Sequence, residues 1–475
     1  MIKYHLITYG CQMNKSDSER IVSVLEKSGF KSTTQDRADI LILNLCSVRQ
    51  SAIDRVWGIL RKTKNQTVIL TGCVLPADKQ KFQNKVDLIL DIKDLPRWPE
   101  KFKIKNSIPD RIGDEIKNFP EVHPDYFSIN PDHSSKFEAY VPIMTGCNNF
   151  CAYCAVPYTR GREVSRPVED IIQEVHTLII QGYKLIILLG QNVNSYKSKI
   201  SNFSLFERSL AEGQFLISNK ISNFKFQISK NTSVNFPTLL KLISRIPGDY
   251  WLSFLTSHPK DLSDELINCF KECEHLIPYL HLPLQSGSNK ILKAMNRNYT
   301  ATDYVKLIKQ VKQIKPMVAV STDIIVGFPS ETKKEFEATA KLMKKIKFDM
   351  AYLAQYSPRP GTAAAKLKDN VLATEKARRR SALNEILKKT ALNNNKKMVG
   401  KRIEVLIEKC NNKNECLGKT KNFKDVKINV APAFRQEKIR PKGRSYTIKK
   451  DLIGQFAKVK ITKANAWNLE GKLII

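Results

Sequence analysis

The first 118 residues alternate short apolar runs with amphipathic stretches. Strand-like runs lie at Tyr4–Tyr9, Ile40–Leu45 and Thr67–Thr71, and helical periodicity is found at Ser18–Ser28 and Ser51–Lys62. Because strands that alternate with helices form parallel sheets with helical crossovers, residues 1–118 are predicted to form an α/β domain. The polar, proline-containing stretch from about residue 101 to 135 is predicted to be a linker.

A second, longer series of apolar runs occupies residues 133–395. Amphipathic stretches such as Val168–Gln181 and Ser263–Lys271 separate the runs, and the basic stretch Ala373–Asn393 is predicted to be a helix that leads out of the series. About six strand-helix units predict a partial or complete barrel of the TIM type. The predicted strands are Ala139–Met144, Leu185–Leu189, Trp251–Leu255, Tyr279–His281, Val318–Ile325 and Met350–Gln355.

Residues 396–475 show a different, two-residue periodicity. Apolar and polar positions alternate at Arg402–Glu408, Val426–Val430 and Phe456–Thr462, with glycine-centred turns between such runs. This pattern predicts a small β-barrel at the C-terminal end.

One segment, residues 197–235, fits neither periodicity. It repeats Ile-Ser-Asn units that begin at Ile200, Ile217 and Ile221. We interpret it as a low-complexity insertion between a strand and the next helix, and we assign it no function.

The composition agrees with a globular protein. Of 475 residues, 42% are hydrophobic and 26% charged, which argues against wholesale disorder. The sequence lacks the roughly 18 consecutive apolar residues of a membrane-spanning helix, and its polar first residues are unlike a secretory signal. We therefore expect a cytoplasmic protein that does not bind membranes.

The charge is strongly positive. The chain has 79 Lys and Arg against 46 Asp and Glu, a net charge of +33, and residues 396–475 alone carry 21 against 7. A solvated lysine-rich surface would explain this excess, but a polyanionic partner explains it better, and nucleic acid is the most common one. A basic run between predicted strands of the barrel makes Arg435, Arg440, Lys442 and Arg444 candidate RNA-binding residues.

Three of the ten cysteines lie in one short motif. The stretch Thr145-Gly-Cys147-Asn-Asn-Phe-Cys151-Ala-Tyr-Cys154 directly follows a predicted strand. Three thiolates from one loop can hold three irons of a 4Fe-4S cluster and leave the fourth iron open to another ligand. A zinc site would need a fourth protein ligand, and neither a histidine nor another cysteine follows at a suitable spacing.

Three further cysteines, Cys11, Cys46 and Cys73, each come just after a predicted strand. The carboxyl ends of parallel strands meet at one edge of a sheet, so these thiols are expected to converge on a second three-cysteine cluster. Gly10 and Gly72 would let the backbone approach that cluster closely.

The remaining cysteines are Cys269, Cys273, Cys410 and Cys416, for which we expect structural roles. Without an export signal, we expect no disulfide bonds among the ten.

These motifs occur in the order found in a known family. The chain resembles the methylthiotransferase family of radical S-adenosylmethionine (SAM) enzymes, and it departs from the family pattern at residues 197–235, at Leu45 and at Leu75–Pro76. The matching stretches are Thr8–Asn14, Cys46–Arg49, Gly72–Val74, Tyr140–Cys154, Val156–Arg166, Leu189–Ser195, Leu282–Ser288, Ser321–Pro329 and Tyr356–Thr362.

The resemblance implies three domains. These are an N-terminal methylthiotransferase domain (1–118), a radical SAM core (133–395) and a C-terminal RNA-binding TRAM domain (396–475). It also implies two 4Fe-4S clusters, an auxiliary one on Cys11, Cys46 and Cys73 and a SAM-binding one on the motif cysteines.

The activity implied by the resemblance is methylthiolation of C2 of N(6)-dimethylallyl(isopentenyl)adenosine, next to the anticodon of tRNA. One SAM would supply the methyl group, a second the 5′-deoxyadenosyl radical, and the auxiliary cluster would present the sulfur. The implied partners are the tRNA anticodon stem-loop, a sulfur donor and an external electron donor such as a flavodoxin or ferredoxin.

Other residues can be assigned only as candidates. Gln191 and Asn192 lie where the superfamily contacts the cofactor's amino group, and Gln285, Ser321 and Asp323 are candidate cofactor contacts at strand ends. The basic run of Arg160, Arg162 and Arg166 suits phosphate or carboxylate contacts. No catalytic side chain beyond the cluster ligands is assigned.

Two alternatives stay open. Within the family, the substrate could be threonylcarbamoyl-adenosine in tRNA or an aspartate of a ribosomal protein. Outside it, the chain could be an iron-sulfur RNA-binding protein without catalysis.

Overall fold

The computed structural model describes residues 1–63, 65–101, 126–200, 233–411, 415–430 and 452–474. The chain divides into two compact units. The first unit contains residues 1–134, 145–164 and 359–365, and the second contains 135–144, 165–358 and 366–475. The motif-cysteine loop therefore belongs to the same unit as the N-terminal sheet. The predicted division into three domains follows other boundaries and stays a prediction.

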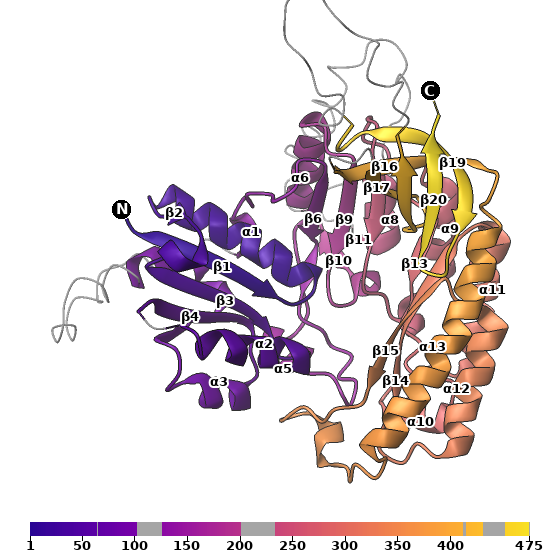
Figure 1. Ribbon diagram of the computed structural model, residues 1–475, viewed down its shortest axis with the longest axis horizontal. Coiled ribbons are helices and arrows are strands. Elements are labelled where there is room, and N and C mark those ends of the chain that lie inside the picture. Colours follow the sequence, from indigo (N-terminus) through magenta and orange to yellow (C-terminus); the bar gives the residue numbers. More distant parts are fainter. Residues whose placement is uncertain (64, 102–125, 201–232, 412–414, 431–451, 475) are drawn as a thin grey trace, which may run out of the picture. The chain divides into compact units, whose positions relative to one another are not determined.

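The first unit is built on a five-stranded parallel sheet with the order β2-β1-β3-β4-β5 (Figure 1). This confirms the α/β fold predicted for the N-terminal part. Its strands are β1 (Lys3–Tyr9), β2 (Lys31–Ser32), β3 (Ile40–Cys46), β4 (Thr67–Cys73) and β5 (Leu88–Ile89).

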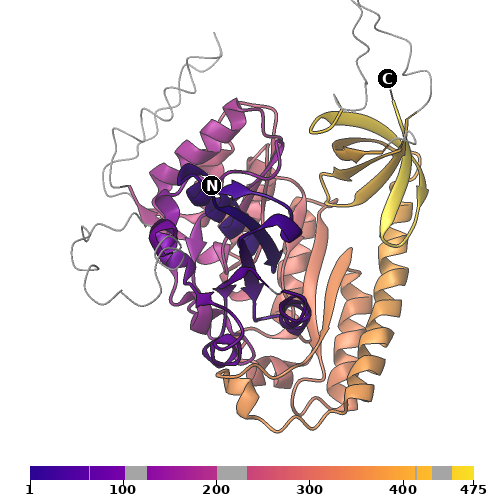
Figure 2. The same ribbon diagram turned by 60° about the vertical axis from the view of Figure 1, so that its left-hand side comes forward.

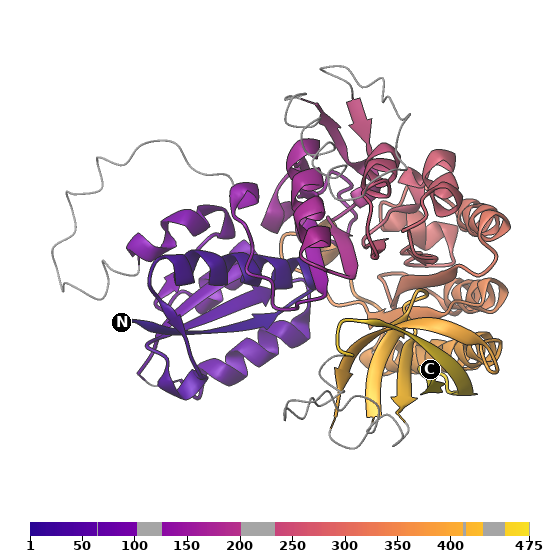
Figure 3. The ribbon, with the colours of Figure 1, turned by 90° about the horizontal axis from the view of Figure 1, so that it is seen from above.

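Helices cover both faces of this sheet (Figure 3), and the alternation along β3 explains why. Ile40 and Ile42 pack into one hydrophobic cluster, whereas Leu41, Leu43 and Leu45 pack into the cluster on the opposite face. The helical segments of the unit are α1 (Gln12–Lys27), η1 (Gln35–Arg37), α2 (Gln50–Leu60), α3 (Pro76–Phe82), η2 (Ile92–Arg97), η3 (Tyr126–Ser128) and α5 (Val156–Arg160).

Helix α1 starts earlier than its apolar periodicity predicts. It begins at Gln12 instead of Ser18, and Cys11 and Asn14 form a capping box at its start. Its first turns bury polar side chains, among them Asn14, Ser16 and Asp17. A buried polar face carries no hydrophobic signal, so the periodicity could not reveal these turns.

The second unit contains two three-stranded parallel sheets, β12-β9-β6 and β13-β14-β15. With the helices packed on them they form the predicted partial barrel. The strands are β6 (Glu138–Pro142), β9 (Leu185–Leu189), β12 (Trp251–Phe254), β13 (Tyr279–His281), β14 (Ala319–Val326) and β15 (Met350–Gln355).

The helical segments after β6 follow the predicted alternation. They are α6 (Val168–Ile180), η4 (Val193–Ser195), α8 (Phe236–Ile243), η5 (Pro259–Asp261), α9 (Asp264–Glu272), α10 (Asn289–Ala294), α11 (Ala301–Ile314), α12 (Lys333–Ile346), η6 (Ala363–Lys366) and α13 (Ala373–Lys396). Among the helices that the structure describes, none is long and apolar enough to cross a membrane.

Short strands mark two interruptions of this pattern. β7 (Met144–Thr145) and β8 (Val164–Ser165) bracket the motif-cysteine loop. β10 (Lys197–Lys199) pairs antiparallel with β11 (Ser233–Asn235), so the two ends of the predicted insertion lie side by side. Residues 201–232 between them lie outside the described residues.

The C-terminal part is a closed five-stranded barrel with the order β16-β17-β18-β20-β19, as predicted (Figure 2). Its strands are β16 (Arg402–Cys410), β17 (Glu415–Thr420), β18 (Asp425–Asn429), β19 (Phe456–Ala464) and β20 (Asn468–Leu473).

One expectation about the barrel cysteines is wrong. Cys410 and Cys416 form a disulfide. The register of β16 and β17 places them directly opposite each other, with Cα atoms 4.0 Å apart. The expectation rested on the redox compartment and did not consider this register.

Within the second unit, the barrel packs against the N-terminal ends of the parallel strands. Asn422, in the turn between β17 and β18, donates to the carbonyl oxygens of Pro278 and Met317, which precede β13 and β14. Trp251, at the start of β12, stacks on Phe456 of β19 with ring centroids 4.7 Å apart.

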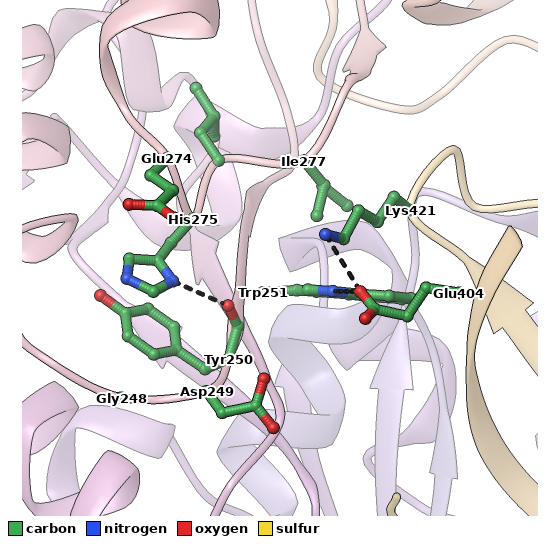
Figure 4. Close-up of a pocket in the computed structure, with 10 residues that line it drawn as sticks. Gly248, Asp249, Tyr250, Trp251, Glu274, His275, Ile277, Glu404 and Lys421 are labelled. Atoms are coloured by element: carbon green, nitrogen blue, oxygen red, sulfur yellow. Dashed lines mark hydrogen bonds and ion pairs between the residues drawn. The ribbon is translucent and has the colours of Figure 1, made fainter. Parts of the chain in front are cut away.

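A cavity of about 220 Å³ lies beside this contact (Figure 4). Glu404 and Lys421 of the barrel region form an ion pair there, and the indole nitrogen of Trp251 donates to Glu404 at 3.3 Å. Trp251 therefore joins the barrel to the sheet through both its ring and its polar atom.

Replacement of Trp251 by alanine should destabilise this contact. Trp251 is only 3% exposed, so the substitution leaves a cavity and should lower the free energy of unfolding by about 3 kcal/mol. Urea denaturation followed by circular dichroism measures the change. Trp467→Ala is the matched control, because Trp467 is 43% exposed, and an equal loss in both variants would contradict this role of Trp251.

Candidate metal centre

Two cysteines meet at the carboxyl edge of the N-terminal sheet. Cys46 is the last residue of β3 and Cys73 the last of β4, and they are direct partners in the parallel register. Both side chains are buried. Cys11 lies just after β1, which is the other neighbour of β3 in the sheet, and it is the N-cap residue of α1. The three cysteines thus lie at, or just after, the carboxyl ends of three adjacent strands, close to where the sequence predicts them.

The thiols influence one another. Burial, together with the neighbouring Cys73, raises the pKa of Cys11. A hydrogen bond from Cys73 lowers the pKa of Cys46.

Gly72 and Gly10 keep the surrounding backbone compact. Gly72 has φ of +98°, and a Cβ atom there would lie 2.4 Å from the carbonyl oxygen of Leu45. At Gly10 a Cβ would lie 2.4 Å from atoms of Asn14. Asn14 in turn donates to Asn44 Oδ1 at 2.8 Å, a buried link between α1 and β3.

Three arginines bring positive charge to this edge. Arg160 Nε donates to Cys73 Sγ at 2.9 Å, Arg49 donates to the carbonyl oxygen of Gly10 at 3.4 Å, and Arg359 donates to the Gln50 side chain at 2.8 Å. Anionic sulfur in a buried site is stabilised by such neighbours.

The basic run predicted from the sequence is divided by the fold. Arg160 is buried and pairs with Asp17 at 2.6 Å, and Arg166 is buried and pairs with Glu174. Arg162 is exposed and lies over the Phe150 ring at 4.4 Å. The sequence did not reveal that Arg160 contacts a cysteine of the N-terminal sheet, since no local pattern relates the two positions.

The motif-cysteine loop is held by the chain that returns after it. The backbone nitrogen of Cys147 donates to the carbonyl oxygen of Gly161 at 3.2 Å, and that of Cys154 to Cys151 at 2.9 Å. Gly146 has φ of +78°, and a Cβ there would lie 1.9 Å from the carbonyl oxygen of Arg162. Burial raises the pKa of Cys147, so its thiolate needs a compensating positive ligand.

The cysteine sets fit iron-sulfur clusters by their chemistry. In the described part of the chain, no group of three or more His, Cys, Asp and Glu side chains is close enough to hold a single metal ion. A cube of four irons holds its thiolates farther apart than a single ion does. Soft thiolates at a buried, arginine-lined edge are the donors that such a cube requires.

In the described part of the second unit, three of the predicted cofactor contacts present buried oxygen atoms without hydrogen-bond partners. Gln191 and Asn192 follow β9, and Gln285 lies beyond β13 with φ of +67°. The side-chain oxygens of all three are buried without a hydrogen-bond partner among the described residues. The Asn192 amide nitrogen is fixed by Asp261 at 2.7 Å.

Ser321 and Asp323 belong to a polar cluster on one face of the β13–β15 sheet. Ser321 Oγ lies 2.8 Å from His281 Nδ1, and His281 Nε2 lies 3.3 Å from Asp323. Ser321 also contacts the Tyr279 hydroxyl at 2.7 Å, and the Tyr352 ring packs on His281.

The members of this cluster that were not predicted from the sequence are Tyr279, His281 and Tyr352. Tyr279 and His281 alternate with the buried Leu280 along β13, so they share one face, and this alternation is a signal that could have identified them.

Comparison with known families defines the class of protein. The Radical SAM superfamily matches residues 141–343, the Uncharacterized protein family UPF0004 matches residues 3–91, and the TRAM domain matches residues 396–474. The chain is therefore a radical SAM enzyme with a TRAM domain.

Curated relatives specify the family. The tRNA-2-methylthio-N(6)-dimethylallyladenosine synthase of Clostridium novyi is 38% identical over 99% of this chain and 96% of its own length. The enzyme of the same name from Dictyoglomus thermophilum is 38% identical over 100% and 99%. The chain belongs to this family of methylthiotransferases, which confirms the resemblance stated from the motifs.

A solved structure is also similar. The radical S-adenosylmethionine methyltransferase TsrM from Kitasatospora setae has a TM-score of 0.48 and 11% identity, and the match covers 77% of each chain.

Gly146→Ala should disturb the motif-cysteine loop. A Cβ at positive φ would overlap the Arg162 carbonyl oxygen, so the reconstituted variant should contain iron for about one cluster instead of two. Iron and sulfide quantitation after anaerobic reconstitution measures this. Gly58→Ala is the control, because a Cβ there meets nothing within 4 Å; full iron content in Gly146→Ala would show that the loop tolerates the change.

Proposed function

We propose that the protein transfers a methylthio group to C2 of N(6)-dimethylallyladenosine next to the anticodon of tRNA. The observation that carries this proposal is the full-length identity to synthases of that name. The two cysteine sets, both within the first unit, support it.

The enzyme uses iron-sulfur clusters and SAM. We assign Cys147, Cys151 and Cys154 to the cluster that binds SAM, and Cys11, Cys46 and Cys73 to the auxiliary cluster. When bound, these groups supply the radical that activates C2 and the sulfur that is transferred. The chain's own part is to hold the thiolates, of which Cys46, Cys73 and Cys147 are buried, and to place Arg160 beside Cys73.

The second unit supplies residues suited to the organic ligands. The unpartnered oxygens of Gln191, Asn192 and Gln285 can accept hydrogen bonds from the amino group of SAM. The cluster formed by Ser321, His281 and Asp323 offers donors and acceptors to a ribose or a base. We propose these as the cofactor and substrate contacts.

The barrel provides a surface for tRNA. The predicted RNA-binding residues Arg435, Arg440, Lys442 and Arg444 lie outside the described residues. Among the described ones, Arg402, Lys460 and Lys472 are exposed and directly opposite one another across β16, β19 and β20. Like charges that face one another across strands repel, which destabilises the free protein. A bound phosphate backbone would relieve this repulsion, so the row suits tRNA as a partner.

The reaction also requires electrons and sulfur from other molecules. We propose an external electron donor such as a flavodoxin or ferredoxin, a separate sulfur donor, and the cytoplasm as the compartment where the tRNA substrate is met.

The test of the substrate is mass spectrometry of tRNA nucleosides from a deletion strain. We expect the methylthio form of dimethylallyladenosine to disappear and its unthiolated precursor to accumulate. Loss of methylthiolated threonylcarbamoyl-adenosine, or of a methylthio-aspartate in a ribosomal protein, with the dimethylallyl form intact would instead support an alternative substrate.

The two cysteine sets should be separable by function. Cys46→Ala should abolish methylthiolation but leave reductive cleavage of SAM detectable, because the SAM-binding cluster keeps its three ligands. Cys151→Ala should abolish both activities, since two thiolates hold a cube poorly. Chromatographic detection of 5′-deoxyadenosine and of the modified nucleoside measures the two activities. Equal loss of SAM cleavage in both variants would contradict the assignment. Absence of SAM cleavage by the wild type would favour a non-catalytic protein.

The basic row should contribute to tRNA affinity. Replacement of Arg402, Lys460 and Lys472 by alanine should weaken binding and reduce the salt slope by about 0.9 for each lost phosphate contact. Filter binding at several salt concentrations measures both. The control replaces Lys341, Lys344 and Lys345, which are exposed on α12 and change the net charge equally; the same effect in both variants would mean that only net charge matters.

A further inference from the structure

Arg160 is the last residue of α5, the helix that follows the motif-cysteine loop. Its side chain is buried in the first unit and contacts the N-terminal sheet instead of solvent. Its Nε atom lies 2.9 Å from Cys73 Sγ, and one terminal nitrogen lies 2.6 Å from an oxygen of Asp17. A single guanidinium thus connects the loop of one cysteine set with a cysteine of the other.

The hydrogen bond between Arg160 and Cys73 can form in one direction only. A guanidinium is permanently protonated and has no acceptor atom, so the Cys73 sulfur must accept the hydrogen bond. A thiolate, free or bound to iron, is a far better acceptor than a thiol. The geometry therefore suits Cys73 in the state in which it binds metal.

Asp17 fixes the guanidinium in place. The Asp17 side chain is fully buried on α1 and also accepts a hydrogen bond from the Tyr126 hydroxyl at 2.6 Å. Burial works against the charge on Arg160, but Asp17 and Cys73 outweigh it and hold the pKa of Arg160 above its usual value. The cation next to Cys73 is permanent because a guanidinium does not lose its proton in a protein.

Arg160 differs in this respect from the other arginines near the site. Arg49 donates to a backbone carbonyl oxygen and Arg359 to the side chain of Gln50. In the contacts of the described residues, Arg160 is the one of these three whose hydrogen bond reaches a sulfur.

We propose that Arg160 is a positioning residue of the auxiliary cluster, which orients the Cys73 thiolate and raises the reduction potential of the cluster that Cys73 ligates. Reduction adds negative charge to a cluster, and a hydrogen-bonded cation at a ligating sulfur stabilises that charge. The inference rests on the proposed assignment of Cys11, Cys46 and Cys73 as ligands of that cluster.

The experiment uses the full chain in which Cys147, Cys151 and Cys154 are replaced by alanine, so that only the auxiliary cluster is reconstituted. Its potential is measured by redox titration followed by electron paramagnetic resonance. Arg160→Gln in this background should shift the potential to a lower value with iron content retained. Arg160→Lys, which keeps the charge but not the fork of donors, should give a smaller shift.

Arg61→Gln is the matched control. Arg61 is an exposed arginine at the end of α2 in the same unit, so its loss changes the net charge equally and should leave the potential unchanged. A shift as large as that of Arg160→Gln would show a general charge effect and overturn the proposal.

A second variant separates a folding defect from the proposed role. Arg160→Gln leaves the buried Asp17 carboxylate unpaired, whereas Asp17→Asn combined with Arg160→Gln does not. A lower potential in the double variant, with iron content retained, supports the proposal. An unchanged potential with iron retained, or loss of iron from a double variant whose melting temperature is unchanged, overturns it. Absence of iron from the parent background would contradict the assignment of the auxiliary cluster as well.

Discussion

The parallel register of β3 and β4 is the constraint on which the candidate metal centre depends. It places Cys46 and Cys73 side by side at the end of two strands that are buried on both faces. A shift of one residue would turn either thiol to the opposite face of the sheet. The alternating Ile and Leu side chains of β3 fill the clusters on the two faces, and this packing prevents such a shift. The hydrophobic core therefore determines the ligand geometry.

The buried ion pair of Arg160 and Asp17 at this edge explains features that packing alone does not. The first turns of α1 bury Asn14, Ser16 and Asp17, which are poor choices for a core that only needs to be stable. Asn14 links α1 to β3, and Asp17 holds Arg160. Asp17 thus keeps the Arg160 cation next to the sulfur atom of Cys73. We infer that buried positions of α1 hold polar side chains in place of apolar ones because they support this ion pair.

The sequence was sufficient for most of the architecture and for the position of Cys11, Cys46 and Cys73 at the carboxyl ends of strands. Apolar runs identified the parallel strands, because buried strands need continuous hydrophobic side chains, and the two-residue alternation identified the C-terminal barrel. It was not sufficient where a residue's role depends on a distant partner. Arg160 was grouped with Arg162 by proximity in the chain, although its side chain is buried and the other is exposed. The disulfide of the barrel was missed because strand register, which no local pattern carries, creates it.

The pairing of β10 with β11 has a consequence for the evolution of the chain. Lys199 and Ser233 are partners in that antiparallel ladder, so the two ends of the sequence between them are neighbours. The entropy of closing a loop grows only slowly with its length once its ends are neighbours. Sequence between the two strands can therefore be gained or lost at small thermodynamic cost, without moving β9 or α8 on either side. Such a position tolerates genetic insertion, and it would accept a foreign peptide or a small domain as readily as the repeats it now holds.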